Sequence, residues 1–313
     1  MSVQADVRPR PAAAAPRAKL TGGLAERQNG LAWTLLAPTL LVVVLVAFVP
    51  LFQTIFQSFT DARLASAKPV NVVGLKNYLD LVRDGSFWAS IKVTIFFTFL
   101  TVTFEFLLGL LIAMVVNSNF KGRGPMRAAM LVPWAIPTVV SAQMWKWMYH
   151  DIYGVINDLL VNKLHVLSSN IAWVADPATS IPAIAAVDIW KTTPFVALLL
   201  LAGLQVIPSD IYEAANVDGA NKVQQFFALT LPLLRPAILV TLIFRTLDSL
   251  RVFDVFYVMF GNRQDTQTMS IYDQQNIVAF SDMGYGGAIS VAIFVVIGIF
   301  VVGYVTFLKV ETT

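Results

Sequence analysis

Four charged residues recur at every third position within an otherwise apolar stretch: Arg245, Asp248, Arg251 and Asp254. Their signs alternate, so on a helix each side chain could pair with its neighbour one turn away. Two roles remain open for each of them: structural pairing, inside the chain or with a second subunit, or contact with a polar solute. Asp248 is the first candidate for solute contact because it is the carboxylate expected nearest the middle of the stretch.

Other polar and aromatic side chains lie in apolar surroundings. Asp188 and Lys191 fall near the start of one apolar run, and Glu105 is the one charge in another. Charges in such positions usually face a partner or a cavity, so Glu105 predicts a structural partner on a neighbouring helix. Trp145 and Trp190 are further candidates for the solute pathway, through their aromatic faces.

The motifs of covalent and metal chemistry are missing from the sequence. There is no cysteine, only two histidines, and no HExxH, GxSxG or GxxxxGK[ST] pattern. From these absences we expect no metal site, no catalytic site and no phosphate-binding loop in this chain. We therefore expect no cofactor in this chain and no enzymatic activity.

The composition predicts an all-α membrane protein. Hydrophobic residues make up 57% of the 313 residues and charged residues 13%, about half of what soluble domains carry. A helix needs roughly 20 apolar residues to cross a bilayer. Six stretches meet this requirement, at residues 32–56, 93–116, 128–148, 182–207, 236–260 and 288–308.

The distribution of positive charge predicts the orientation. The tail at residues 1–30 is rich in Ala, Pro and Arg and is expected to be disordered. It precedes a membrane domain at residues 31–313. The short loop after the second stretch holds Lys121, Arg123 and Arg127 without an acid. By the positive-inside rule both segments are cytoplasmic, which places both termini and the loop at 208–232 on that side.

The loop at residues 208–232 reads as two short helices separated by a glycine. Ser209 is a plausible N-cap, and Asp210 and Glu213 favour a helix start through the helix dipole. Gly219 permits a chain reversal, and Pro232 is expected to end the second helix. From the residues alone, this hairpin is either a connector on the membrane surface or a docking element for a partner.

A resemblance to a known family decides between these interpretations. The runs Glu213-Ala214-Ala215, Asp218-Gly219-Ala220 and Leu231-Pro232 resemble the EAA loop of the permeases of ATP-binding-cassette importers, with Leu229 in place of the usual Ile. The segments WKTTPF, LLAGLQVIP and LRVFDVFYVM resemble the carbohydrate, maltose-type branch. The tail and overall pattern are similar to mycobacterial trehalose-importer permeases.

The resemblance implies a type I importer permease in a bacterial plasma membrane. It implies a second homologous permease, two ATPase subunits that bind ATP and Mg, an extracytoplasmic sugar-binding lipoprotein and a carbohydrate, with trehalose the first choice. No nucleic acid is expected. The implied ATPase-docking residues are Tyr212, Glu213, Ala214, Ala215, Asp218, Gly219, Ala220, Phe226, Leu231 and Pro232.

The intramembrane charges also suit two rival functions. In an ion-coupled secondary carrier Glu105 and the charged stripe would be the coupling groups, but the hairpin would have no role. A membrane-embedded enzyme would need a catalytic constellation that the sequence does not show.

Overall fold

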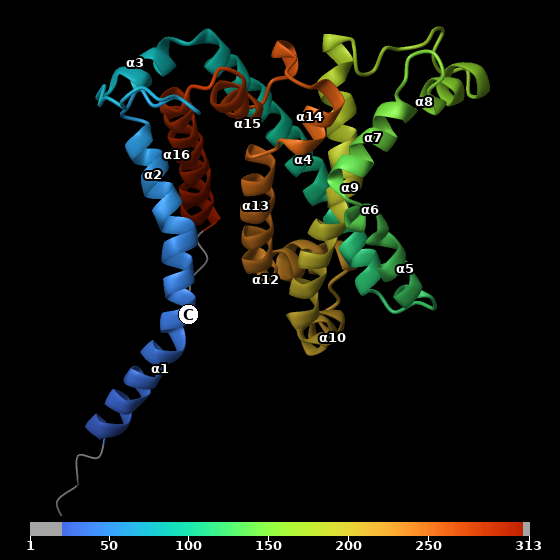
Figure 1. Ribbon diagram of the computed structural model, residues 1–313. Coiled ribbons are helices and arrows are strands. Elements are labelled where there is room, and N and C mark those ends of the chain that lie inside the picture. The colour runs from blue at the N-terminus through green and yellow to red at the C-terminus, as the bar shows by residue number, and fades with distance from the viewer. Residues whose placement is uncertain (1–20, 309–313) are drawn as a thin grey trace, which may run out of the picture. The chain divides into compact units, whose positions relative to one another are not determined.

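The computed structural model describes residues 21–308, in two units that meet between Gln53 and Thr54. Each unit is considered by itself. Across the described residues the regular elements are helices, and two isolated β-bridges join Thr60 to Val72 and Arg63 to Asp282. The predicted all-α class is confirmed (Figure 1).

The first unit is one long helical run. It comprises α1 (Thr21–Val43), a π-helical turn (Val44–Phe48) and the start of α2 (Val49–Gln57). Residues 31–57 are long and apolar enough to cross a membrane. The helix includes residues 21–30, which we had assigned to a disordered tail, and the rest of that predicted tail lies outside the described residues.

The second unit contains the other predicted spans. Three are single helices: α4 (Gly85–Asn117), α9 (Pro177–Val206) and α16 (Met283–Leu308). The shorter elements are α3 (Lys76–Arg83), α8 (Val155–Asn157), a π-helical turn (Asp158–Lys163), a 3-10 turn (Gln264–Thr266), α15 (Met269–Gln274) and a π-helical turn (Gln275–Ala279).

The third and fifth spans are broken rather than straight. The third consists of α5 (Arg123–Met130) and α6 (Val132–Ala135), followed after an 86° bend by α7 (Thr138–Met148). The fifth pairs residues 222–233 with residues 235–260 across a 66° bend. Counting each bent pair as one span, up to six helical segments meet the requirements for crossing a membrane among the described residues.

The fifth span is also interrupted in its C-terminal half. It contains α13 (Arg235–Leu250) and the separate helix α14 (Asp254–Phe260). Arg251 lies between them with φ −104° and ψ 17°. The expected helical stripe of four charges therefore ends after Asp248, and Arg251 and Asp254 extend from a loop and from a new helix.

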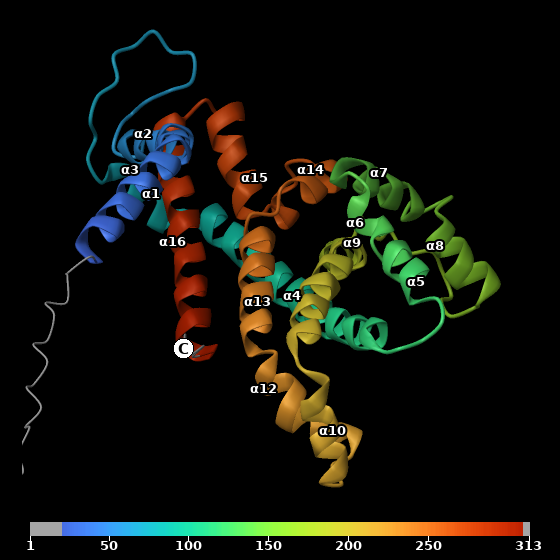
Figure 2. The same ribbon diagram turned by 90° about the horizontal axis from the view of Figure 1, so that it is seen from below.

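Helices α4, α9 and α13 pack against one another and form the centre of the second unit (Figure 2). Small residues permit the close approach. A Cβ on Gly109 of α4 would lie 2.5 Å from Val196 of α9, and one on Gly203 of α9 would lie 2.4 Å from Ala237 of α13. Membrane helices use small residues at contacts in this way because backbones can then approach closely.

Two ends of the second unit are distinct (Figure 1). α5 and α10 (Ser209–Val217) lie at one end of the central helices, whereas α3, α8 and α15 lie at the other. At this second end the Asp84 carboxylate accepts hydrogen bonds from Tyr272 and from Tyr285, the latter at 2.6 Å. Asp84 also caps α4 by accepting from the backbone amide of Ser86 at 2.8 Å. One carboxylate thereby ties α4, α15 and α16 together.

Candidate functional site

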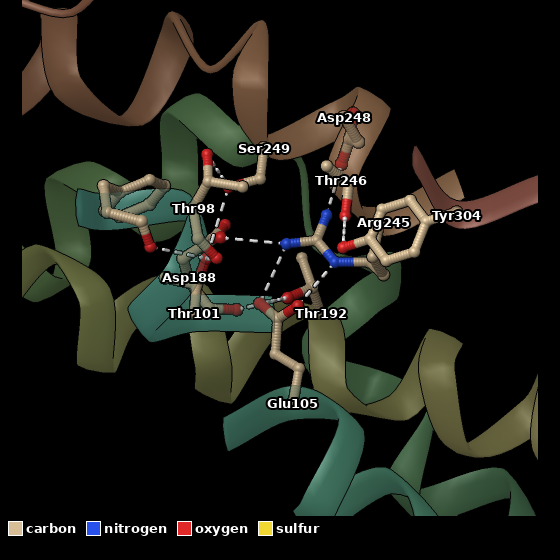
Figure 3. Close-up of polar contacts among 11 residues, drawn as sticks. Thr98, Thr101, Glu105, Asp188, Thr192, Arg245, Thr246, Asp248, Ser249 and Tyr304 are labelled. Atoms are coloured by element: carbon tan, nitrogen blue, oxygen red, sulfur yellow. Dashed lines mark hydrogen bonds and ion pairs between the residues drawn. The ribbon is translucent and has the colours of Figure 1, made fainter. Parts of the chain in front are cut away.

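The Arg245 guanidinium is the centre of a buried ion cluster (Figure 3). Its Nε donates to Glu105 Oε2 at 2.5 Å, and its Nη2 donates to Glu105 Oε1 at 2.8 Å and to Asp188 Oδ2 at 3.1 Å. Its Nη1 donates to Asp248 Oδ2 at 2.6 Å. The hydroxyl of Thr192 also donates to Glu105. The structural partner predicted for Glu105 is therefore Arg245.

The cluster joins the three central helices, since Glu105 is on α4, Asp188 is on α9 and Arg245 is on α13. Arg245 and Glu105 are buried, whereas 71% of the Asp248 side chain is exposed. Arg245 thus has a buried structural side, formed with Glu105, and a side that holds Asp248 at an accessible surface. Of the expected pairs along the charged stripe, the described residues show the one between Arg245 and Asp248.

A second polar contact fixes the same helices nearby. The Ser249 hydroxyl on α13 donates to Thr98 Oγ1 at 3.1 Å and lies 3.2 Å from Thr101 Oγ1, both on α4. Thr246 of α13 lies 2.9 Å from the Tyr304 hydroxyl of α16. Because hydroxyl groups in an apolar interior are costly unless they are hydrogen-bonded, these contacts favour one register of α13 against α4 and against α16.

A cavity of about 440 Å³ opens beside the ion cluster, between the α6–α7 break, α9 and the α13–α14 break. This size falls within the usual range for small-molecule sites. The charged side chains that line it are Asp188, Lys191, Arg245, Asp248, Arg251 and Asp254. All six charged residues that we assigned to the solute pathway therefore border one cavity.

The two tryptophans assigned to that pathway do not line this cavity. Trp145 and Trp190 contact each other edge to face, with ring centroids 5.5 Å apart, and Trp145 packs against buried core residues. Trp134 of α6 lines the cavity instead, half exposed and stacked on Phe195 at 5.8 Å. The aromatic side chains that line the cavity are therefore those of Trp134 and Phe253.

The predicted hairpin is present at the end of α9 and α13 that lies opposite α3, α8 and α15 (Figure 1). α10 ends at Val217, and Gly219 has φ +80°, which reverses the chain as predicted. The second limb begins with α11 (Lys222–Gln225), where Asn221 and Gln224 form a reciprocal capping box.

Two details of the hairpin differ from prediction. Pro208, not Ser209, is the N-cap residue of α10, and no side chain caps it. The second limb does not end at Pro232: it continues through a π-helical turn (Phe226–Thr230) into α12 (Leu231–Leu233). Pro232 lies directly after the π-helical turn, where the backbone hydrogen-bond register changes, so the limb passes through it.

Side-chain hydrogen bonds connect the two limbs of the hairpin. The buried amide of Gln225 donates to Asn216 Oδ1 at 2.7 Å and to the Ala220 carbonyl at 2.9 Å. The hydroxyls of Tyr212 and Thr230 lie 2.9 Å apart. The hairpin is therefore internally braced, which is what a partner-docking element requires in order to transmit a displacement.

The residues implied for docking divide between the surface and the interior. Glu213, Ala214, Asp218 and Gly219 are exposed, whereas Ala215 is buried and Tyr212, Ala220, Phe226, Leu231 and Pro232 are half-buried. Phe226 and Leu231 pack against the core of α4, α9 and α13. The aromatic side chain that the hairpin exposes is Phe227, at 62%, beside the exposed Val217 and Val223.

The model of one protein family, described as "Binding-protein-dependent transport system inner membrane component", matches residues 105–308. The chain belongs to this family. The match begins at Glu105 and contains the whole ion cluster, the cavity and the hairpin. This permease is therefore a component of an inner-membrane transport system.

Curated relatives cover nearly the whole permease. It is 43% identical to the trehalose/maltose transport system permease protein MalF of Thermococcus litoralis, over 91% of this chain and 96% of that one. It is 41% identical to the sulfoquinovosyl glycerol transport system permease protein SmoG of Agrobacterium fabrum, over 84% and 85%. It is 38% identical to the trehalose transport system permease protein SugA of Mycobacterium tuberculosis, over 87% and 85%.

A solved structure has the same fold. A chain from a bacterial ABC transporter that imports the acidic polysaccharide alginate aligns with a TM-score of 0.77 at 22% identity, over 93% of this chain and 99% of that one. The helical permease fold predicted from the sequence is thereby confirmed.

Sequence reasoning missed three contributors to these sites. Thr192 reads as an ordinary helix residue, and Trp134 lies in a segment whose break brings it to the cavity. Gln225 lies within the hairpin, but its contacts depend on how the two limbs cross. A sequence signal for Gln225 did exist: it is a polar residue on the side of its limb that faces Asn216 of the other limb.

Proposed function

We propose that this permease is the membrane-spanning subunit of an ATP-driven carbohydrate importer, with a disaccharide as its substrate and trehalose as the first choice. Family membership supports the transport role. The names of the relatives in Thermococcus and Mycobacterium support trehalose, and that of the Agrobacterium relative supports a different glycoside. The chain itself carries out no chemical reaction.

One observation carries the proposal: a single stretch of chain, from the hairpin through α13 to Asp254, links a docking surface to the charged cavity. A displacement of the hairpin would move α13, and Asp248 with it. In alternating access this coupling would let the ATPase open the cavity to one side of the membrane and then to the other.

The cavity suits a sugar because it combines hydrogen-bonding groups with an aromatic face. Asp248 and Asp254 would accept hydrogen bonds from hydroxyl groups, and Arg251 would donate. The ring of Trp134 would contact the apolar C–H surface of a pyranose. The polar groups are few and convergent, as is usual in small-molecule sites.

The remaining parts of the importer belong to other chains. Under this proposal a second homologous permease completes the pathway, two ATPase subunits bind ATP and Mg, and an extracytoplasmic lipoprotein delivers the sugar. The exposed Glu213 would pair with a basic group in a cleft of the ATPase subunit. The hairpin and α5, which lie at one end of the central helices (Figure 1), would face the cytoplasm, together with both termini.

Uptake of labelled sugars by a strain that lacks this permease tests the proposal. We expect trehalose uptake to return with the wild-type gene and not with Asp248→Asn, while both variants assemble. Vesicles separate the rival function: import that an ion gradient drives without ATP would identify a secondary carrier and overturn the proposal.

A further inference from the structure

We infer that the cavity at Asp248 selects uncharged polyhydroxylated solutes and rejects anionic ones. The inference rests on the proposed function, which it narrows to neutral sugars. Three acidic and three basic residues line the cavity, so their number favours neither sign of charge. The inference follows from which of these groups are already paired within the protein and which are accessible to a ligand.

The first cation, Arg245, is unavailable to a ligand. Each of its three nitrogens donates to a carboxylate oxygen, of Glu105, Asp188 or Asp248. Three carboxylates surround one guanidinium, so the cluster carries a surplus of negative charge when all of them are ionised. Its side chain is 3% exposed, and an anion could reach it only by displacing one of these partners.

The second cation, Lys191, is also occupied. Its Nζ donates to the Ile136 carbonyl at 2.5 Å and lies 3.5 Å from the Trp134 carbonyl. These carbonyls belong to the end of α6, where the negative end of the helix dipole favours a cation. Lys191 is 8% exposed, so its charge stabilises the break in the third span and is not available to bind an anion in the cavity.

The third cation, Arg251, is exposed and is accompanied by two accessible carboxylates. Its Nε donates to the Leu247 carbonyl at 3.2 Å. Asp248 uses only Oδ2 for Arg245, and within the described part of the chain Asp254 accepts no hydrogen bond. Among the described residues, the cavity thus offers one accessible cation and several free acceptor oxygens. Hydroxyl groups, which both donate and accept, satisfy this set more fully than a carboxylate or phosphate, which only accepts.

The start of α7 is the feature that most favours an anion. Pro137 and Thr138 line the cavity, and a helix N-terminus carries about half of a positive charge. The facing carboxylates of Asp248 and Asp254 carry a full charge each and outweigh it. The second helix start at the cavity, that of α14, adds about another half charge, and the two full negative charges of Asp248 and Asp254 together still exceed the two half charges.

A matched pair of sugars tests the inference. The probes are trehalose and the trehalose derivative in which one C6 CH₂OH is oxidised to a carboxylate, so that size and stereochemistry are retained. Binding is measured calorimetrically on the purified assembly of permease and ATPase subunits. The binding protein is left out because it would impose its own selection. We expect trehalose to bind at least about tenfold more tightly, equivalent to ~1.4 kcal/mol, with a smaller ratio at high salt.

Variants locate the effect. Asp248→Asn and Asp254→Asn together should reduce the ratio to about threefold or less by tightening the binding of the carboxylate derivative, since they remove the repulsion and keep the shape. Asp80→Asn is the control, because Asp80 is exposed on α3 and pairs with Lys76; it should leave the ratio unchanged.

The outcomes separate the two claims. Equal binding of both probes by the wild type, or a ratio that the double variant does not alter, would overturn the inference and leave sugar transport standing. Failure of every neutral sugar to bind would instead refute the proposed function.

Discussion

The Glu105 carboxylate on α4 forms a two-pronged ion pair with the Arg245 guanidinium on α13, at 2.5 and 2.8 Å. Both side chains are buried. Parallel hydrogen bonds between a guanidinium and a carboxylate fix orientation as well as distance. The pair therefore sets how α13 lies against α4, and with it the position of Asp248 at the cavity.

We expect Glu105→Ala to destabilise the permease by about 3 kcal/mol, because removal of one partner of a buried pair leaves an incompletely compensated charge. The measurement is thermal unfolding of the detergent-solubilised protein. The double variant Glu105→Leu/Arg245→Met removes both charges and should recover much of the loss. An unchanged midpoint for Glu105→Ala would show that Asp188 and Asp248 suffice to hold Arg245.

Much of the fold was predictable because its signals are local. Apolar runs of bilayer length give the spans, and Gly219 marks the chain reversal without any tertiary contact. The breaks were less accessible. Two prolines predict a bend near residue 136, but they do not specify 86°. The interruption at Arg251 has no proline or glycine, and it arises where α14 turns to pack against α7.

The site was predictable as a list of residues but not as an arrangement. Because a charge in an apolar segment is costly, Glu105, Asp188 and Arg245 are each expected to have a partner of opposite charge or to face a cavity. Which of them meet depends on the crossing of helices separated by as many as 140 residues in sequence. The presence of Trp134, and not Trp145, at the cavity depends likewise on the bend of the third span, which the sequence alone does not specify.

Glu213→Ala should weaken association with the ATPase subunit while the permease itself folds normally, because Glu213 is exposed and lacks an ion pair within the described residues. Co-purification of the ATPase with the tagged permease measures this. Asp210→Ala is the control, since it removes an exposed acid from the first turn of the same helix. An intact complex with normal transport would contradict the docking role.

Gln225→Leu should loosen the hairpin without removing any exposed group. It deletes the two hydrogen bonds that the Gln225 amide donates and the one that Gln225 Oε1 accepts from Lys222 at 3.2 Å. Asn216 Oδ1 and the Ala220 carbonyl are left without their partner, at a cost of about 1–3 kcal/mol. Hydrogen exchange of the amides of residues 209–233 should accelerate. A double-mutant cycle with Asn216→Ala isolates the shared contact; additive effects of the two changes would argue against the brace.

Asp273, on α15, predicts a pH-dependent stability. Burial raises the pKa of its carboxyl from 3.8 to about 6, against a smaller lowering by the hydrogen bond from Ser290. Because the folded-state pKa is the higher one, the contribution to stability is present below pH 4 and is lost as the pH rises through 6. Asp273→Asn should therefore raise the free energy of unfolding at pH 7.5 by about 3 kcal/mol at most, and have little effect on it at pH 4. A gain of equal size at both values would exclude titration as its cause.

Lys191→Met should relax the bend in the third span. The variant removes the ammonium that donates a hydrogen bond to the Ile136 carbonyl. An unpaired carbonyl in an apolar region favours a continuous helix, in which a backbone amide would donate to it. The chain has no cysteine, so spin labels at the exposed positions 128 and 144 report one distance. A straight helix would separate these positions by about 24 Å and a right-angled one by about 17 Å. We expect Lys191→Met to populate the longer distance and to lower transport. The control Lys92→Met changes an exposed lysine of α4 and should do neither.

If the bend persists in Lys191→Met, packing of α6 and α7 against α9 maintains it. Any loss of transport would then point to a direct role of the ammonium at the cavity.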